Sequence, residues 1–274
     1  MIRDITIGQY YPAKSAVHRL DPRVKIVCTL LFLISLFLQK SILGYAIATV
    51  FMATVIRMSK VPFKFIVKGL KPIIMLLMIT VVFNLFLITG GKVLVHVWIF
   101  RITEMGLSTA VFMAVRLTYL IIGSSLMTFT TTPNSLTDAI ERLLHPLNKI
   151  KVPVHEIAMM MSIALRFIPI LLEETDKIMK AQIARGADLE SGNMIQRAKS
   201  MIPILVPLFV SAFRRANDLA MAMESRCYRG GDGRTTMKPL VYHRRDYLAY
   251  VITIVYVIAV FVVGRYVPFH LWIF

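Results

Sequence analysis

Two arginines stand between small residues at corresponding places in the second half of the chain. One lies in AQIARGADLE and the other, forty-one residues later, in AMAMESRCYRGG. An arginine with small neighbours can enter a groove on a partner. Its planar guanidinium can then bind a carboxylate or several carbonyl oxygens. A solvated arginine near a helix C-terminus, favoured by the macrodipole, is the alternative for either site alone. The predicted docking residues are Ala184, Arg185, Gly186, Ser225, Arg226 and Cys227.

The sequence contains none of the common motifs for catalysis. It has no G-x-x-x-x-G-K-[ST] phosphate loop, no G-x-S-x-G elbow and no H-E-x-x-H pair. The six histidines are scattered without ligand spacing. Cys28 and Cys227 form neither a disulfide framework nor a zinc site. We therefore predict a chain that is not itself an enzyme, holds no metal and binds no cofactor.

The composition is that of a membrane protein. The 274 residues are 57% apolar, with a mean hydropathy of +0.69, whereas soluble domains are nearer 45–50% apolar. The net charge of +17 could suggest nucleic-acid binding. The basic residues, however, cluster beside apolar runs, as cytoplasmic loops of membrane proteins do. Nucleic acid is thus not an expected partner, and the basic, polar N-terminus is not expected to be a signal peptide.

Apolar runs predict five transmembrane helices, since a span needs about 20 residues. Between the third and fourth spans, KVLVHVWIFRIT alternates and predicts a small interfacial hairpin with Trp98 and Phe100 at headgroup depth. We expect Gly90-Gly91 to end the third span. The predicted spans are 24–38, 42–56, 72–89, 106–128 and 248–263.

Lysine and arginine counts predict the orientation. Residues 1–25 and 57–71 hold five each and residues 131–246 hold seventeen, whereas the opposite loops hold three. The positive-inside rule places the N-terminus in the cytoplasm of a prokaryotic cell membrane protein. The predicted domains are a membrane domain of four helices (1–130), a cytoplasmic domain (131–245) and a C-terminal transmembrane helix (246–274).

The cytoplasmic segment contains two further apolar stretches, IALRFIPILLEE and MIPILVPLFVSAF. Because proline and arginine interrupt them and charged helix follows, we expect helices along or under the membrane, partly covered by another protein. Two more crossings are the alternative, since proline is tolerated in such helices. One apolar stripe recurs at spacings of three and four at Phe209, Phe213, Ala216, Ala220 and Met223, matched less well by Ile168, Leu172, Thr175, Met179 and Gln182.

Glycines predict where these two long helices end. Gly186 and Gly192 would release the first, and Gly230-Gly231-Asp232-Gly233 the second.

Two polar residues, Asn84 and Arg116, fall within predicted spans. An arginine within a membrane span is by default a candidate functional residue. A helix-to-helix clamp that bonds a carbonyl or Asn84 is the favoured structural role here. The spans contain no Asp or Glu, which weakens the idea of an ion-coupled carrier.

These residues resemble the transmembrane (T) component of energy-coupling factor (ECF) transporters, the EcfT/CbiQ family. The resemblance covers most of the chain and rests on the order and spacing of several segments. It implies an all-α membrane protein with a cytoplasmic coupling domain of two long crossed amphipathic helices. The segments are GQYYPAKSAVHRLDPRVKI, MAVRLTYL, TTTPNSLTDAIERLLHPLNKIKVPVHEIAMMMSIALRFIP, EETDKIMKAQIARGADLE and AMAMESRCYRGG.

The resemblance also implies partners. In that family each arginine of an Ala-Arg-Gly-like motif enters a groove on one of two ABC-type ATPase subunits, which hold ATP and Mg. Here the second triplet has Ser225 and Cys227 as flanks, so the choice of ATPase is open. A small substrate-binding membrane subunit, the S component, would contact an apolar face made of Leu172, Met179, Ile183, Phe209, Phe213, Ala216, Ala220 and Met223.

The sequence thus predicts the scaffold and transducer of an ATP-driven vitamin or transition-metal importer. A self-sufficient secondary transporter is the alternative, and it would need a midplane binding site and coupling ions. A membrane enzyme is disfavoured because no nucleophile–base pair appears.

Overall fold

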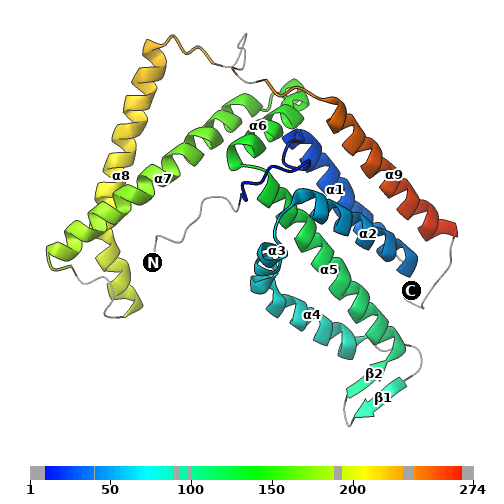
Figure 1. The fold of residues 1–274 in the computed structure, drawn as a ribbon. Helices are drawn as coiled ribbons and strands as arrows, with labels where there is room; N and C mark the ends of the chain where they lie inside the picture. Colours follow the sequence, from blue (N-terminus) through cyan, green and yellow to red (C-terminus); the bar gives the residue numbers. More distant parts are fainter. Residues whose placement is uncertain are drawn as a thin grey trace. The chain divides into compact units, whose positions relative to one another are not determined.

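The computed structural model describes residues 10–39, 41–88, 90, 93–97, 100–187, 193–230, 237 and 239–266. The predicted all-helical class is confirmed, with one short antiparallel hairpin in the predicted place (Figure 1). Trp98 lies outside the described residues. The elements in chain order are α1 (Pro22–Leu38), α2 (Ile42–Ser59), α3 (Phe63–Leu70), a 3₁₀ turn (Lys71–Ile73), α4 (Ile74–Leu87), β1 (Val93–Val97), β2 (Phe100–Thr103), α5 (Glu104–Thr130), α6 (Pro133–Leu144), a 3₁₀ turn (His145–Ile150), α7 (Val154–Ala184), α8 (Met194–Ser225) and α9 (Arg244–Tyr266).

The chain forms two compact units. The smaller unit contains Ile140–Pro239, and the larger contains Gly8–Ala139 with Leu240–Phe274. The predicted domain boundaries at 130 and 245 stay predictions, because packing divides the chain by contacts and not by membrane position.

Four described helices are long and apolar enough to cross a membrane: α2, α5, α7 and α9. Helices α1 and α4, with 17 and 14 residues, are shorter than these four, of which α2 with 18 residues is the shortest. The predicted third span is therefore shorter than expected, because the chain at its start forms a 3₁₀ turn and α4 begins only at Ile74. Helix α7, predicted to lie along the membrane, is apolar enough to cross by this measure alone.

The core of the larger unit lies among α1, α2, α3, α5 and α9. Its buried side chains include Phe32 from α1, Met52 from α2 and Leu126 from α5. Gly123 lets α5 approach α1 closely, since a Cβ there would lie 3.0 Å from the Phe32 ring. The hydroxyls of Ser35 and Tyr256 lie 3.0 Å apart and link α1 to α9.

Candidate functional site: the ends of two crossed helices

Helices α7 and α8 carry both predicted docking triplets. They contain 31 and 32 residues, well above the usual 11 or 12. Helix α8 begins where the Asn193 backbone N–H donates to the Gln196 side-chain oxygen at 3.1 Å. Each helix contains proline, Pro169 in α7 and Pro203 and Pro207 in α8, and yet continues to its arginine.

The two helices cross, and side chains join them (Figure 1). Glu174 of α7 accepts hydrogen bonds from Ser211 at 2.8 Å and from Arg215 at 2.7 Å. Nearer the end of α7, the Gln182 amide donates to the carbonyl of Pro203 at 3.2 Å. Figure 1 shows the C-terminal ends of the two helices apart from one another.

Arg185 occupies the C-cap of α7, at the centre of a Schellman motif. The N–H of Gly186 donates to the carbonyl of Ile183 at 2.9 Å, and the N–H of Ala187 donates to the carbonyl of Gln182 at 3.0 Å. This pair of bonds satisfies carbonyls that a helix end would leave without donors. Gly186 has a φ of +86°, as the motif requires, so its predicted role in releasing the first helix is confirmed.

Arg226 occupies the same position at the end of α8. The N–H of Cys227 donates to the carbonyl of Glu224 at 2.9 Å, and the N–H of Tyr228 donates to that of Met223 at 3.0 Å. The residue in the left-handed region here is Cys227, with a φ of 57°. The prediction that Gly230 and its neighbours end this helix was wrong, because the Schellman turn closes three residues before Gly230.

Both triplets are open to solvent. Ala184, Arg185 and Gly186 are exposed, as are all three residues of the second triplet, and a Cβ on Gly186 would meet nothing within 4 Å. Within the part of the chain that the structure describes, neither guanidinium has a hydrogen-bond or ion-pair partner. Among the described residues the small flanks are exposed rather than packed, and each arginine stands in a Schellman turn at the end of its helix.

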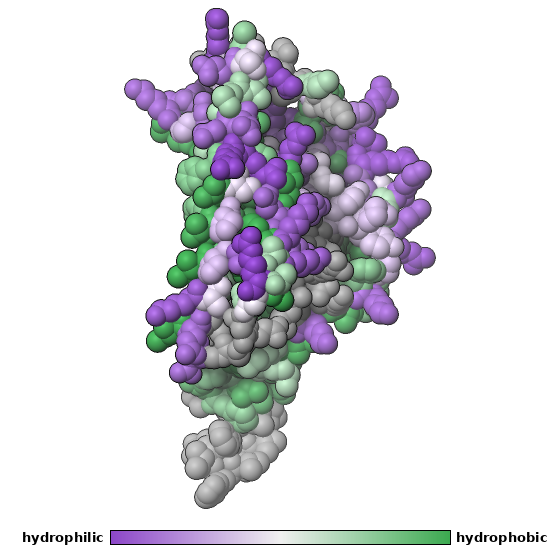
Figure 2. Space-filling view, turned by 90° about the vertical axis from the view of Figure 1, so that its left-hand side faces the viewer, coloured by the Kyte–Doolittle hydropathy of each residue, from purple (hydrophilic) through white to green (hydrophobic). Residues whose placement is uncertain are grey.

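Apolar side chains are also exposed earlier along α8. Phe209 and Phe213 are 63% and 64% exposed, and with Arg214 and Asn217 they line a shallow groove along the helix. Figure 2 shows hydrophobic side chains interspersed with hydrophilic ones on the side where α7 and α8 lie. Of the remaining residues predicted to face a substrate-binding subunit, Ile183, Ala216 and Ala220 are exposed, and Leu172, Met179 and Met223 are half-buried.

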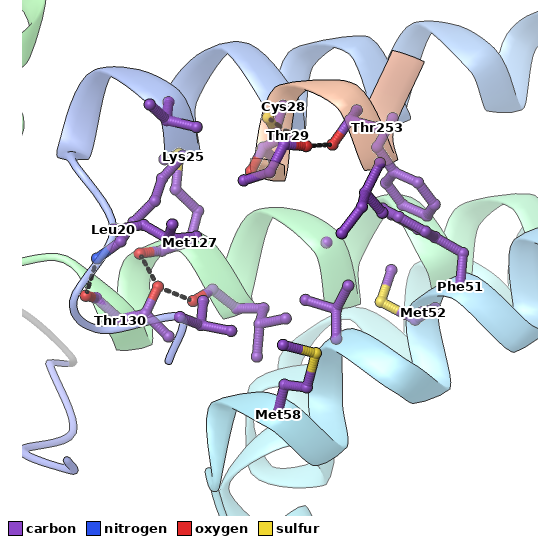
Figure 3. A pocket seen from close by; sticks show the side chains of 18 residues that line it. Leu20, Lys25, Cys28, Thr29, Phe51, Met52, Met58, Met127, Thr130 and Thr253 are labelled. Atoms are coloured by element: carbon purple, nitrogen blue, oxygen red, sulfur yellow. Dashed lines mark hydrogen bonds between the residues drawn. The ribbon is translucent and has the colours of Figure 1, made fainter. Parts of the chain in front are cut away.

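The larger unit contains a separate apolar cavity of about 170 Å³ among α1, α2, α5 and α9. Hydrophobic side chains such as Phe51, Met52 and Met127 line it (Figure 3). The Lys25 ammonium at its wall donates to the carbonyls of His18 at 3.2 Å and Thr130 at 2.8 Å. No cluster of three metal-ligating side chains occurs among the described residues.

Arg116 joins α5 to the turn between α1 and α2. Its Nε donates to the Tyr45 hydroxyl at 3.0 Å and its Nη2 to the Gln39 carbonyl at 3.1 Å. Asn84 does not contact it; the Asn84 amide donates to the carbonyl of Thr80 in its own helix at 2.8 Å. The geometry is that of a clamp between helices.

Sequence reasoning missed the polar contacts at the crossing. No motif in the sequence assigns Glu174 a partner, and Gln182 appears there only as a weak member of an apolar stripe. A signal was present in the spacing of Pro203 and Pro207, because prolines four residues apart leave the carbonyl of the first without a helical donor.

Comparisons with known proteins show the family of this chain. Residues 13–237 match the model of the CbiQ family, described as cobalt transport protein. An energy-coupling factor transporter transmembrane protein EcfT from Clostridium kluyveri is 60% identical over 91% of this chain and 93% of its own length. Proteins of the same name from Ruminiclostridium cellulolyticum and Bacillus subtilis are 57% and 48% identical, over 93% and 90% of this chain and 96% and 93% of their own lengths. The chain therefore belongs to the EcfT/CbiQ family of transmembrane components of energy-coupling factor transporters.

Proposed function

We propose that this chain transmits ATP-driven movement from two partner ATPases to a substrate-binding membrane subunit in a micronutrient importer. The observation that supports this best is the equivalence of the two helix ends. Both present an exposed arginine from the C-cap of a Schellman turn, between small residues, and neither guanidinium has a partner in the described part of the chain.

Each arginine would act as an anchor and not as a catalyst. A guanidinium that projects from a rigid turn can form bidentate bonds to a carboxylate or to backbone carbonyls in a groove. Small flanks let the groove close around it, since Ala184 and Gly186 carry little or no side chain. One ATPase would hold Arg185 and the other Arg226, and ATP and Mg would be bound by those subunits.

Movement would then pass along the helices as rigid bodies. Helix α8 extends eleven residues from Arg215 to Arg226, about 16 Å at 1.5 Å per residue. The exposed apolar side chains that precede Arg215 on α8, including Phe209 and Phe213, would contact the substrate-binding subunit. The membrane would be the cell membrane of a prokaryote, and the distribution of basic residues favours a cytoplasmic N-terminus and cytoplasmic α7 and α8.

Co-purification with the two ATPases of the same transporter tests this proposal. The chain is co-expressed with both ATPases, and a tag on one of them is used for capture. Wild type should retain both, Arg185→Glu and Arg226→Glu should each lose one, and the double variant should lose both. Lys177→Glu, a reversal of an exposed charge on α7 away from its end, is the matched control and should retain both. Retention of both ATPases by the double variant would refute the docking role.

A further inference from the structure

Pro207 leaves one carbonyl of α8 without its helical donor. In an α-helix the N–H of each residue donates to the carbonyl four residues before it. Proline has no N–H, so the carbonyl of Pro203 receives no such bond from position 207. The Pro203 carbonyl is therefore a free hydrogen-bond acceptor in the interior of α8, where an uninterrupted helix would already have bonded it.

Gln182 uses that acceptor. Its side-chain amide donates to the Pro203 carbonyl at 3.2 Å. Its own backbone carbonyl accepts the N–H of Ala187 in the Schellman turn that carries Arg185. One residue thus joins the turn at the end of α7 directly to the middle of α8.

Glu174 makes the second contact, one carboxylate oxygen with Ser211 and the other with Arg215. Glu174 and Gln182 are eight residues apart on α7, and their partners Ser211 and Pro203 are eight residues apart on α8. At 1.5 Å per residue the two contacts are separated by about 12 Å. A scissor rotation of about 15° around one contact would displace the other by about 3 Å and break its hydrogen bond.

Few apolar side chains near the crossing are fully buried. Among the α8 side chains whose exposure is described, only Ile204 is buried. The buried side chains of α7, Val154 and Ala158, lie in its first turns, far from Gln182. The apolar side chains here are at most partly buried with the exception of Ile204, so the polar contacts, whose lengths depend directly on the angle between the helices, can fix that angle.

We infer that Glu174 and Gln182 on α7, with Ser211, Arg215 and the Pro203 carbonyl freed by Pro207 on α8, form a two-point lock that fixes the crossing angle and so positions both arginine ends. The geometry of the lock is independent of the proposed function. Its role in transmitting movement rests on that function, because a lever is useful only when both of its ends are held.

Distance measurements between spin labels test the lock in the full chain in lipid nanodiscs. Labels are attached at Met161→Cys and Met221→Cys, on exposed positions of α7 and α8, in a chain that also carries Cys28→Ser and Cys227→Gly. This background should give one narrow distance distribution. Gln182→Leu removes the donor, and Pro207→Ala returns an N–H that competes for the Pro203 carbonyl.

Both substitutions should broaden the distribution of distances between the labels. The population outside the main distance should rise about fivefold, which corresponds to the loss of one net hydrogen bond. The Gln182→Leu, Pro207→Ala double variant should be no broader than either single variant, because both act on one bond. Pro203→Ala is the matched control. It also returns an N–H to α8, but it leaves the carbonyl at 203 without a helical donor, and the distribution should stay narrow.

The charge pair gives a second measurement. Glu174→Arg and Arg215→Glu should each broaden the distribution, and the two together should narrow it again, which a general loss of helix packing would not do. Distributions as narrow as the background in Gln182→Leu and Pro207→Ala would overturn the inference. Broadened distributions in a chain whose wild type captures no ATPase would support the lock and refute the proposed function instead.

Discussion

Gly186 and Cys227 occupy the same backbone position in two Schellman turns, each one residue after an arginine, with φ of 86° and 57°. Glycine adopts this conformation without steric cost, whereas a residue with a Cβ pays about 1–2 kcal/mol. The turn at Arg185 is therefore unstrained and the turn at Arg226 is strained.

Exchanging the residue types at these positions should move the stability of the two turns in opposite directions. Gly186→Ala should loosen the end of α7 by about 1 kcal/mol and speed hydrogen exchange at the amides of 186 and 187 about fivefold. Cys227→Gly should slow exchange at 227 and 228, and Cys227→Ala, which keeps the Cβ, should not. Slower exchange in Cys227→Ala than in Cys227→Gly would show that the thiol, and not the backbone, governs this turn.

Asp246 links the N-terminal segment to α9. Its carboxylate is 1% exposed and accepts the backbone N–H of Asp21 at 2.9 Å and of His243 at 2.7 Å. Asp246→Ala would leave both donors without an acceptor and should cost about 3 kcal/mol, which lowers Tm by about 5–10 °C. Asp246→Asn keeps one acceptor oxygen and should cost clearly less. Thermal unfolding of the purified chain in detergent measures both, and equal losses would show that the charge and not the acceptor geometry is essential.

His18 should make stability depend on pH in the mildly acidic range. Its Nε2 donates to the Tyr11 carbonyl at 2.9 Å, so in the neutral ring Nδ1 accepts from the Ser15 hydroxyl at 2.7 Å. Burial lowers the pKa of His18 below 6.5; the bond to Tyr11 opposes this and the charge of Lys25 adds to it. The unfolded chain then binds a proton before the folded chain does, so stability is full above pH 6.5 and falls as pH decreases through the lowered pKa.

Melting temperatures between pH 8 and pH 3 would show this fall, and His18→Gln should remove it. A second fall should remain in that variant below about pH 4. Burial by itself raises the pKa of Asp21, but the hydrogen bonds from Arg23 outweigh it and hold that pKa below 3.8. The stability that this ion pair contributes is present above pH 3.8 and is lost as Asp21 is protonated. An unchanged slope between pH 6.5 and 5 in His18→Gln would exclude His18 as its source.

Arg116 should matter for stability rather than for ATPase binding. Arg116→Met removes the bonds to Tyr45 and to the Gln39 carbonyl and should cost about 1–3 kcal/mol in thermal unfolding. Tyr45→Phe should cost less, and the double variant should cost less than the two singles added, because one bond is shared. The variant should still bind both ATPases. A wild-type Tm for Arg116→Met would contradict the clamp and restore a transport role as the hypothesis to test.

Several features follow directly from the order of residue types along the chain. The apolar runs predict α2, α5 and α9, because a lipid-solvated helix needs about 20 residues of one chemical kind. The alternating run before α5 predicts the hairpin, because successive side chains in a strand point to opposite faces. Arg185 and Arg226 stand out because their small neighbours are adjacent in sequence.

Tertiary structure decided how the turn at Arg226 is built and which contacts join the two long helices. In the sequence, the three glycines and one aspartate at 230–233 are the expected end of α8. The turn forms at Cys227 instead, because hydrogen bonds within the turn offset the strain of one left-handed residue. Gln182 and Pro203 are twenty-one residues apart, and no local pattern pairs a side-chain amide with a carbonyl that a proline elsewhere has freed. Helix propensity and hydropathy are local properties of a sequence. The partner of a hydrogen bond between helices exists only once the helices have crossed.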